Sequence, residues 1–401
     1  MTISEPLAKG TMAGLVPHAE DWREELEWIR EDEGGVILFE AVGFGELQDH
    51  LRAEGFGVIG GSSFGDRLET DRSFALDLLA EQGLKVAPVR QFSSASQAIA
   101  DVQREPRRCV FKLCDSAGET FVGTFNDGSD IAAFLHAHPP AERTPFILMD
   151  HVEGVETGVG AYFNGERFLR PSCLDWEHKR FFAGDMGELT GEMGTVATFR
   201  GSDRLFEALL LPLEQRFRDA RHVGWVNLNT IINERGVWPL EFTCRFGYPG
   251  FAVLEPLQGI PWSNLLRMLA DRNSQGFGTR DGFSTCIVLT TPPMPLSRKQ
   301  VTAPVGLPVK VDEMDLRHLH LGEVGAGAGG LVTSGLYGWT AVVTGTGETI
   351  VQSVANAYAN AGKVRAPNLR YRLDIGDALM KGDLERLVDW GWIAPCDLKG
   401  R

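Results

Sequence analysis

The chain is organised around a predicted β-hairpin whose second strand is Val237-Trp238-Pro239-Leu240-Glu241-Phe242-Thr243-Cys244-Arg245-Phe246-Gly247. Its first strand is Trp225-Val226-Asn227-Leu228-Asn229-Thr230-Ile231-Ile232. Apolar and polar residues alternate in both segments, which indicates β-strands with one buried face. The connection 234–236 ends in glycine, the pattern of a three-residue turn, so we expect antiparallel pairing.

One face of this hairpin is polar. Pairing Asn233 with Val237 places Asn229 opposite Glu241 and Asn227 opposite Thr243, and residues two apart share a face. The polar row is Asn227, Asn229, Glu241, Thr243 and Arg245, and the apolar row is Val226, Leu228, Leu240, Phe242 and Cys244. Oxygen ligands beside an arginine suit a hard divalent cation that holds phosphates; a solvated sheet face is the alternative.

Composition places the chain among ordinary globular proteins. Its 401 residues predict two to four domains, with 43% hydrophobic and 23% charged residues. A net charge of −15 argues against bulk binding of nucleic acid or an anionic membrane. The six cysteines form no CxxC pair, and neither a signal peptide nor a membrane-spanning apolar run is visible, so we expect a cytoplasmic protein with reduced thiols.

Three further segments carry chemical signals. Lys112 lies inside the apolar strand 109–114, where its ammonium needs an anion or a path to water. Residues 60–65 form a glycine-rich turn before a predicted helix at 68–82, which fits either a phosphate cradle or ordinary loop geometry. Residues 177–194 combine a basic triplet with a glycine-rich loop, which is typical of an anion-facing active-site loop or of a solvated surface loop.

One sequence motif lies in a structural context that does not suit its usual function. Residues 325–330 match the pattern GxGxxG, but they precede a predicted strand instead of opening a helix. The dinucleotide-binding interpretation is therefore rejected.

Taken in order, these segments resemble the phosphoribosylamine–glycine ligase family of the ATP-grasp superfamily over roughly residues 57–375. The matching motifs are Asp71-Arg72-Ser73-Phe74-Ala75, Val110-Phe111-Lys112, Glu177-His178-Lys179-Arg180, Thr190-Gly191-Glu192-Met193-Gly194, Leu240 to Gly247, Gly335 to Val343 and Tyr371 to Gly376. The resemblance implies an α/β (α+β) ATP-grasp fold. Its expected parts are a small N-terminal α/β domain (1–66), an ATP-grasp region (67–275) with a lid at about 86–155, a mostly β C-terminal domain (276–376) and a tail helix (377–401).

The family's activity implies what this chain would do. ATP phosphorylates a carboxylate, and an amine then attacks the acyl phosphate to form an amide, with no protein nucleophile. The expected cofactors are ATP and Mg²⁺ (or Mn²⁺), and the expected partners are a small amino acid and an amine. A monomer or a homodimer is expected.

The resemblance also implies the roles of individual residues. Arg245 and Lys179 are expected to be catalytic. Contacts to ATP are expected from Lys112 at the phosphates, from the hinge Asp150, His151 and Val152 at the adenine, from Glu156 at the ribose hydroxyls, and from Arg180. Contacts to the amino-acid substrate are expected from Thr190, Gly191, Met193 and Gly194. Glu241 is expected to bind the metal ion together with Asn229 and Thr243.

Several positions depart from the family. Thr243 stands where the family has asparagine, so we hypothesise that Asn229 supplies the missing amide oxygen. Tyr248 and Gly250 replace two carboxylates, Glu192 replaces a glycine, and the lid loop at 118–119 lacks its usual lysine. The region before the match is also shorter than the family's N-terminal domain and lacks its glycine-rich loop.

Three functional interpretations follow. The leading one is an ATP-dependent carboxylate–amine ligase, joining an amino acid such as glycine to an amine acceptor that need not be phosphoribosylamine. The first alternative is a divergent phosphoribosylamine–glycine ligase of purine biosynthesis. The second alternative is an inactive nucleotide-binding regulatory or assembly protein.

Overall fold

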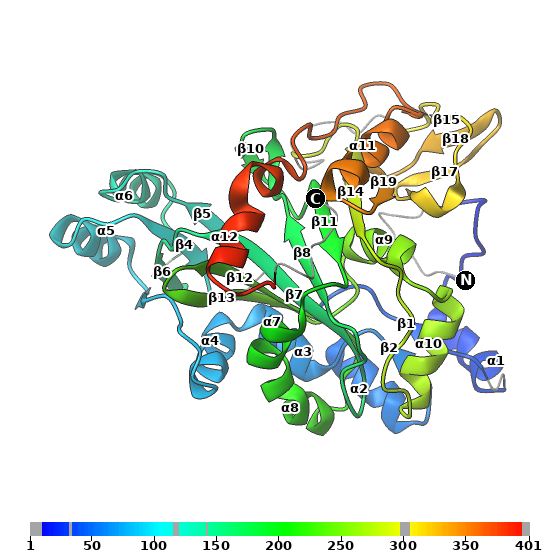
Figure 1. The fold of residues 1–401 in the computed structure, drawn as a ribbon, viewed down its shortest axis with the longest axis horizontal. Helices are drawn as coiled ribbons and strands as arrows, with labels where there is room; N and C mark the ends of the chain where they lie inside the picture. Colours follow the sequence, from blue (N-terminus) through cyan, green and yellow to red (C-terminus); the bar gives the residue numbers. More distant parts are fainter. Residues whose placement is uncertain (1–9, 32–33, 115–119, 142, 297–304, 395–401) are drawn as a thin grey trace.

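The structure, a computed structural model, describes residues 10–31, 34–114, 120–141, 143–296 and 305–394. A large antiparallel sheet runs through its middle (Figure 1). The eight strands lie side by side in the order β13 (Gly236–Thr243), β12 (Val223–Asn233), β7 (Val155–Asn164), β8 (Cys173–Glu177), β11 (Gly194–Thr198), β14 (Phe283–Thr290), β19 (Trp339–Gly347) and β16 (Leu319–Leu321). The predicted α/β (α+β) composition is confirmed.

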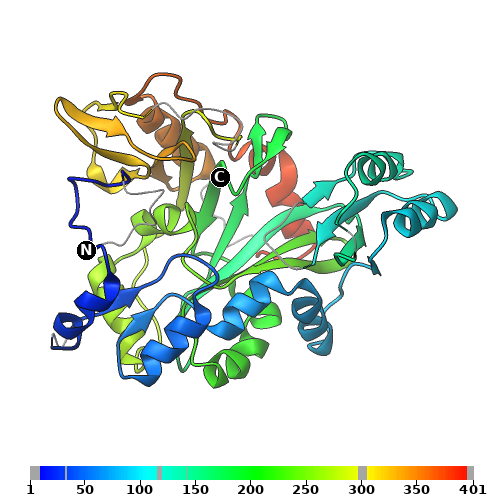
Figure 2. The same ribbon diagram turned by 180° about the vertical axis from the view of Figure 1, so that it is seen from behind.

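A second, four-stranded antiparallel sheet projects from one end of the molecule, as both ribbon views show (Figure 1, Figure 2). Its strands follow the order β3 (Val89–Phe92), β6 (Phe146–Asp150), β4 (Cys109–Leu113) and β5 (Thr120–Val122), with helices α5 (Ala95–Arg104) and α6 (Ser129–Ala137). This unit occupies the range predicted for the lid. The lid loop at 118–119, where the sequence lacks the usual lysine, lies outside the described residues.

The N-terminal region is small. Strands β1 (Ile37–Leu38) and β2 (Val58–Ile59) pair in parallel beside helices α1 (Leu26–Glu31) and α2 (Gly45–Ala53). The helix predicted at 68–82 is instead two helices, α3 (Ser63–Thr70) and α4 (Arg72–Glu81). The break lies at Asp71, whose carboxylate accepts a hydrogen bond from the Phe74 amide and so caps α4.

The C-terminal region continues the central sheet through β14, β19 and β16. Helix α11 (Ile350–Ala361) packs on β14 and β19. Four short strands form two small antiparallel pairs, β15 (Lys310–Val311) with β20 (Val364–Arg365) and β17 (Val324–Gly327) with β18 (Gly330–Thr333). The rejected GxGxxG motif spans the β17–β18 hairpin. The π-helical turn Leu379–Asp383 and helix α12 (Leu384–Asp389) lie in the predicted tail.

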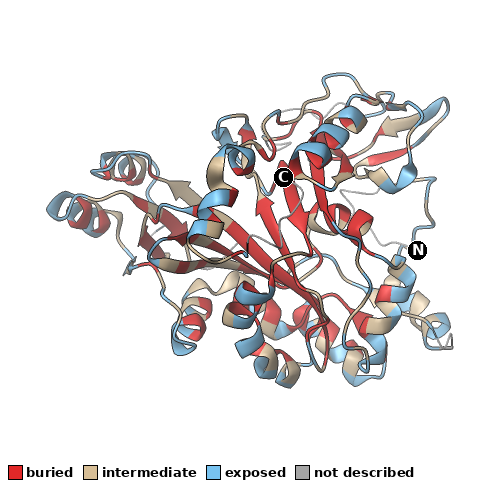
Figure 3. Ribbon diagram, viewed as in Figure 1, coloured by how far each residue is buried: buried red, intermediate tan, exposed pale blue. Residues whose placement is uncertain are grey.

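The central sheet has two hydrophobic faces with separate cores. Helices α4, α7 (Asp203–Leu209), α8 (Glu214–Asp219), α11 and α12 pack on one face, whereas α9 (Gly250–Leu254) and α10 (Trp262–Asp271) pack on the other. The strands between them are largely buried, and the outer sides of the helices are exposed (Figure 3). Two strands, β9 (Arg180–Phe182) and β10 (Met186–Leu189), form a hairpin at the edge of this arrangement.

The β12–β13 hairpin has the predicted pairs Asn229–Glu241 and Asn227–Thr243. Its turn differs from the prediction, because Asn233 pairs with Gly236 and the turn has two residues. An irregularity at Leu240 restores the register, since Thr230 pairs with Pro239 and Asn229 with Glu241. Proline has no amide hydrogen to donate, which makes Pro239 a natural place for a strand to bulge.

Within the described ranges, no helix is both long enough and apolar enough to cross a bilayer. Among the described residues, Cys109, Cys173, Cys244 and Cys286 form no disulfide.

Candidate active site

Two glycines of β7 leave part of the polar face of the central sheet without side chains. Gly158 lies between Asn229 of β12 and Asp175 of β8, and a Cβ atom there would lie 2.1 Å from Asp175 Oδ1. A Cβ atom at Gly160 would lie equally close to Trp225 Cζ2. Any other residue at these positions would push these side chains away from β7.

Side chains of β12 and β8 therefore meet above β7. Asn227 Nδ2 donates to Asp175 Oδ2 at 2.6 Å, and Asn229 Nδ2 donates to Glu177 Oε2 at 2.9 Å. The polar row predicted for the hairpin thus faces a second row of carboxylates on β8. The alternative of a solvated sheet face does not hold for Asn227 and Asn229, which are both buried.

Lys179 lies at the centre of these carboxylates. Its Nζ atom lies 2.6 Å from Glu241 Oε1, 3.3 Å from Glu177 Oε2 and 3.8 Å from Glu156 Oε1. The three acids come from β13, β8 and β7, so the cluster joins strands that are far apart in the sequence. The structure thus brings together Lys179, which was predicted to be catalytic, Glu241, which was predicted to bind the metal ion, and Glu156, which was predicted to contact the ribose.

The cluster shifts the titration of its members. The Lys179 ammonium holds the pKa of Glu241 well below its usual range, although burial opposes this shift. Burial would lower the pKa of Lys179, but the carboxylates of Glu241, Glu177 and Glu156 outweigh it and raise this pKa well above its ordinary value. Burial raises the pKa of Glu156 to about 7, against the attraction of Lys179. Lys179 and Glu241 are therefore a charged pair at neutral pH.

Lys112 reaches the same cluster from the lid strand β4. Its side chain is 8% exposed, and burial lowers its pKa to about 8, with Glu241 opposing the shift and the cations of Arg72 and Lys179 adding to it. Arg72 Nη1 lies 3.9 Å from Glu241 Oε2. A buried ammonium whose pKa is lowered by burial would gain from an added anion, which is the environment expected of a phosphate contact.

The predicted adenine hinge follows β6. The Asp150 amide donates to Pro88 O, the His151 amide donates to Arg108 O, and the Asp150 carboxylate accepts from Arg107 Nε at 2.8 Å. Val152 is buried in a small apolar cluster with Ala87, Ile147 and Met149. The Asp150 and His151 amides are thus engaged within the protein, and the predicted adenine contact of this segment stays a prediction.

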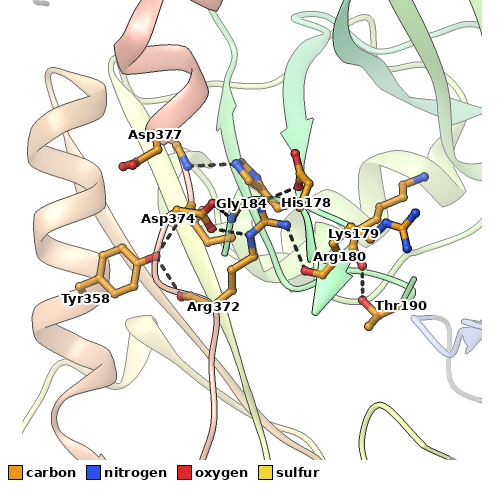
Figure 4. Close-up of polar contacts among 12 residues, drawn as sticks. His178, Lys179, Arg180, Gly184, Thr190, Tyr358, Arg372, Asp374 and Asp377 are labelled. Carbon is orange, nitrogen blue, oxygen red and sulfur yellow. Dashed lines mark hydrogen bonds and ion pairs between the residues drawn. The ribbon is translucent and has the colours of Figure 1, made fainter. Parts of the chain in front are cut away.

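The segment after β8 is fixed by the C-terminal region (Figure 4). Arg372 is 2% exposed; it donates to the Arg180 carbonyl and pairs with Asp185 and Asp374. Thr190 donates twice to the Lys179 carbonyl, through its amide at 2.8 Å and its hydroxyl at 2.7 Å. These contacts set the backbone from which the Lys179 side chain extends.

Two predicted substrate residues lie away from the cavity. The Met193 side chain is fully buried with Phe181 and Met294, so only its backbone could serve a substrate. Gly194 begins β11, and a Cβ atom there would lie 2.6 Å from Cys286 O, which explains the glycine by packing. Gly191, by contrast, lines the cavity described next.

A cavity of about 490 Å³ opens over the polar face of the sheet. Five acidic and two basic side chains line it, together with three aromatic rings; these are Glu40, Asp175, Glu177, Glu192, Glu241, Lys179, Arg245, Trp225, Tyr248 and Trp339. Both bases have acidic partners, because Lys179 contacts Glu241 and Arg245 Nε lies 3.1 Å from Glu69 Oε1. Burial raises the pKa of Glu69 to about 7, with Arg245 opposing.

The residues proposed for a divalent metal fit that role. Asn229 Oδ1 is buried without a hydrogen-bond partner, next to a Glu241 carboxylate that is already paired with a cation. Thr243 lines the same cavity. Magnesium is commonly held by one or two carboxylates together with neutral oxygens, water and substrate phosphates. Among the described residues, no group of three or more His, Cys, Asp or Glu side chains could hold a metal ion alone.

Sequence reasoning missed Asp175, Glu69 and Arg72 as site residues. Asp175 and Glu177 alternate along β8, so their shared face was readable. The distance between β8 and β12 could not be read from the sequence, because it depends on β7 lying between them and on the two glycines of that strand.

Comparison with protein families matches residues 70–251 to the phosphoribosylglycinamide synthetase ATP-grasp (A) domain. The chain is 26% identical over 347 residues to the phosphoribosylamine–glycine ligase of Nostoc sp., covering 82% of this chain and 80% of that protein.

Comparison with solved structures confirms the predicted ATP-grasp type of fold. The phosphoribosylamine–glycine ligase of Thermotoga maritima superposes with a TM-score of 0.68 at 20% identity, over 90% of both chains. The biotin carboxylase domain of the Hydrogenobacter thermophilus 2-oxoglutarate carboxylase, solved with MgADP, ADP and bicarbonate, has a TM-score of 0.60 at 12% identity, over 92% of this chain and 83% of that one.

Proposed function

Because this chain is an ATP-grasp ligase that resembles phosphoribosylamine–glycine ligase, we propose that it joins glycine to phosphoribosylamine with ATP. The expectation of a different acceptor has no support in the comparisons, whose curated relatives carry the phosphoribosylamine–glycine ligase name. The first alternative drawn from the sequence is therefore preferred.

One observation carries the proposal. Lys112 from β4, Lys179 from the segment after β8 and Glu241 from β13 share one electrostatic cluster. An ATP-dependent ligase needs its phosphate-binding cations and its metal carboxylate at one place, although the chain supplies them from distant segments.

The proposed reaction has two steps. A glycine carboxylate oxygen attacks the γ-phosphorus, the bond to the β–γ bridging oxygen breaks, and ADP leaves. The amine nitrogen then attacks the acyl carbon, phosphate leaves with its oxygen, and the nitrogen loses one proton to solvent. Lys112 and Arg245 would hold the phosphates, while Lys179 would stabilise the negative charge that builds up on the transferred group.

Mg²⁺, when bound, would neutralise phosphate charge and orient the terminal phosphate. Glu241 and Asn229 would hold it, with Thr243 as a further oxygen. Lys179, whose ammonium lies 2.6 Å from Glu241 Oε1, would turn toward the phosphate.

The test is ADP release in the presence of ATP, Mg²⁺, glycine and phosphoribosylamine formed in place from ribose 5-phosphate and ammonia. Product is identified by mass spectrometry, with Glu241→Gln as the inactive control. ADP release that requires both substrates supports the proposal. ADP release with other amines but not with the ribosylamine overturns it.

A second candidate is a ligase with a phosphate-free amine acceptor. It is favoured by the cavity, because the two basic side chains lining it are paired with carboxylates within the described residues. A panel of alkylamines in the same assay distinguishes the two. An inactive nucleotide-binding protein would bind ATP but release no ADP with any pair.

A further inference from the structure

Two buried carboxylates of the cavity play no part in the proposed ATP chemistry. Asp175 is 6% exposed and Glu192 is 7% exposed, and both line the cavity. Asp175 Oδ1 and Glu192 Oε1 are buried without any hydrogen-bond partner. A buried acceptor without a partner costs free energy, so such atoms call for a ligand donor.

We propose that Asp175 and Glu192 form a binding site for the protonated amine of an organic ligand. The side chains come from different parts of the fold, Asp175 from β8 and Glu192 from the loop before β11, and they converge on one cavity. Burial raises the pKa of Asp175 to about 8 and that of Glu192 well above its ordinary value, and neighbouring carboxylates raise both further, so an entering ammonium would stabilise their charged forms.

The backbone is built to leave space for these groups. Gly158 lets the Asp175 carboxylate lie against β7, and Asn227 Nδ2 fixes its other oxygen at 2.6 Å. This contact leaves Oδ1 as the acceptor without a partner. The carboxylate is thus oriented by the protein before any ligand arrives, which lowers the cost of binding.

The surrounding groups favour an organic cation. Trp339 stacks on Tyr248, with ring centroids 4.9 Å apart and an interplanar angle of 26°, and it packs against Gly191, which adjoins Glu192. Trp225 lines the same cavity. Aromatic faces beside carboxylates bind the carbon part of an amine and add cation–π attraction to its charge.

Other occupants fit less well. A phosphate or carboxylate would meet five acidic side chains, and the two basic ones already have acidic partners. A divalent metal would meet the Asn227 Nδ2 donor beside Asp175, and these acids belong to no group of the described residues that could hold a metal ion. A proton shared between the two acids would require a hydrogen bond, which Asp175 Oδ1 and Glu192 Oε1 lack.

The ammonium has two possible sources, namely the amino group of the amino-acid substrate and a separate alkylamine. Assigning it to a substrate rests on the proposed ligase function, whereas the site itself does not. Binding is therefore measured on the full chain without ATP, so that a failure of the site and a failure of the ligase activity are separate results.

The experiment uses four probes at equal ionic strength: glycine, 1,4-diaminobutane, acetate and ribose 5-phosphate. Binding is followed by ligand-observed NMR and by the fluorescence of the cavity tryptophans Trp225 and Trp339. The variants are Asp175→Asn and Glu192→Gln, which keep the side-chain shape, and the control is Glu207→Gln on the exposed surface of α7. Thermal melts check that each variant is folded.

We expect at least one amine probe to bind, with affinity falling roughly tenfold or more in both cavity variants and remaining unchanged in Glu207→Gln. Glycine binding identifies the amino-acid source, and binding of 1,4-diaminobutane alone identifies a separate amine. The proposal is overturned if neither amine binds, if acetate or ribose 5-phosphate loses affinity in the cavity variants as the amines do, or if folded cavity variants keep full amine affinity.

Discussion

Lys179 Nζ lies 2.6 Å from Glu241 Oε1, so a lysine occupies the place next to the carboxylate proposed to bind a metal ion. Glu177 and Glu156 lie within 4 Å of the same nitrogen. A single ammonium thus balances three carboxylates drawn from three strands. Because Mg²⁺ would seek the same oxygen atoms, this ammonium and the metal are expected to compete when no nucleotide is bound.

Replacing Lys179 by methionine tests this competition. The change removes the cation but keeps much of the side chain's volume, leaving Glu241, Glu177 and Glu156 to repel one another. We expect unfolding to become easier by about 1–3 kcal/mol, less than for a fully buried pair because the Glu241 side chain is 40% exposed.

Magnesium should restore the stability that Lys179→Met loses. In calorimetric melts, Mg²⁺ is expected to raise the Tm of Lys179→Met more than that of the wild type, because it replaces the missing positive charge. Equal Mg²⁺ responses in the two proteins would show that the metal does not use this position.

Asn229→Ala tests the amide oxygen at the metal site. Removing Oδ1 should weaken Mn²⁺ or Mg²⁺ binding in the presence of ADP by roughly tenfold, the loss expected for one contact to a charged group. The measurement is a metal titration by calorimetry or, with Mn²⁺, by magnetic resonance. Asn229→Asp keeps an oxygen in place and should retain metal affinity; if alanine binds metal as well as the wild type, Asn229 is not a ligand.

The pH dependence of nucleotide binding tests Lys112. Its pKa is lowered to about 8 by burial, so its charge is lost as pH rises through that value. ATP affinity should therefore fall between pH 7 and 9.5, by roughly tenfold if the phosphate contact is made. In Lys112→Arg the guanidinium stays charged and the profile should flatten. A fall of the same size in the arginine variant would assign the titration to another group.

The same residue predicts a change in stability. The folded chain binds the Lys112 proton less tightly than the unfolded chain, in which the lysine has its ordinary pKa of 10.5. The contribution of Lys112 to the free energy of unfolding therefore rises as pH rises from about 8 toward 10.5. Chemical denaturation of the wild type and of Lys112→Met across this range should show the difference.

Gly158→Ala tests the packing of the Asp175 carboxylate against β7. The added Cβ would lie 2.1 Å from Asp175 Oδ1, so the carboxylate must move or β7 must shift. We expect a destabilisation of about 1–3 kcal/mol, as for other overpacked positions, measured by chemical denaturation. Gly278→Ala is the matched control, because an added Cβ there meets nothing within 4 Å. Equal stability of the two variants would contradict the packing described.

The sequence was sufficient for local relationships. Alternation predicted the Asn229–Glu241 and Asn227–Thr243 pairs, which the structure confirms, although the turn is one residue shorter and the strand bulges at Leu240. Asp71 was also readable as a helix cap, yet the periodicity across residues 68–82 favoured a single helix.

Contacts between distant strands could not be predicted in the same way. Lys179 meets Glu241 only because the order β13-β12-β7-β8 brings the end of β8 toward the hairpin. Asp175 meets Asn227 only because Gly158 and Gly160 leave β7 without side chains between them. These relationships depend on which strands are neighbours, and a two-residue period gives no information about that.

The most direct test of the proposed function is ADP release by the wild-type chain with ATP, Mg²⁺, glycine and phosphoribosylamine, compared with reactions that omit one substrate. The account predicts ADP in equal amount to a product containing both glycine and the ribosylamine, and none without either of them. Formation of that product without ADP, or ADP release that is unchanged when glycine is omitted, would contradict it.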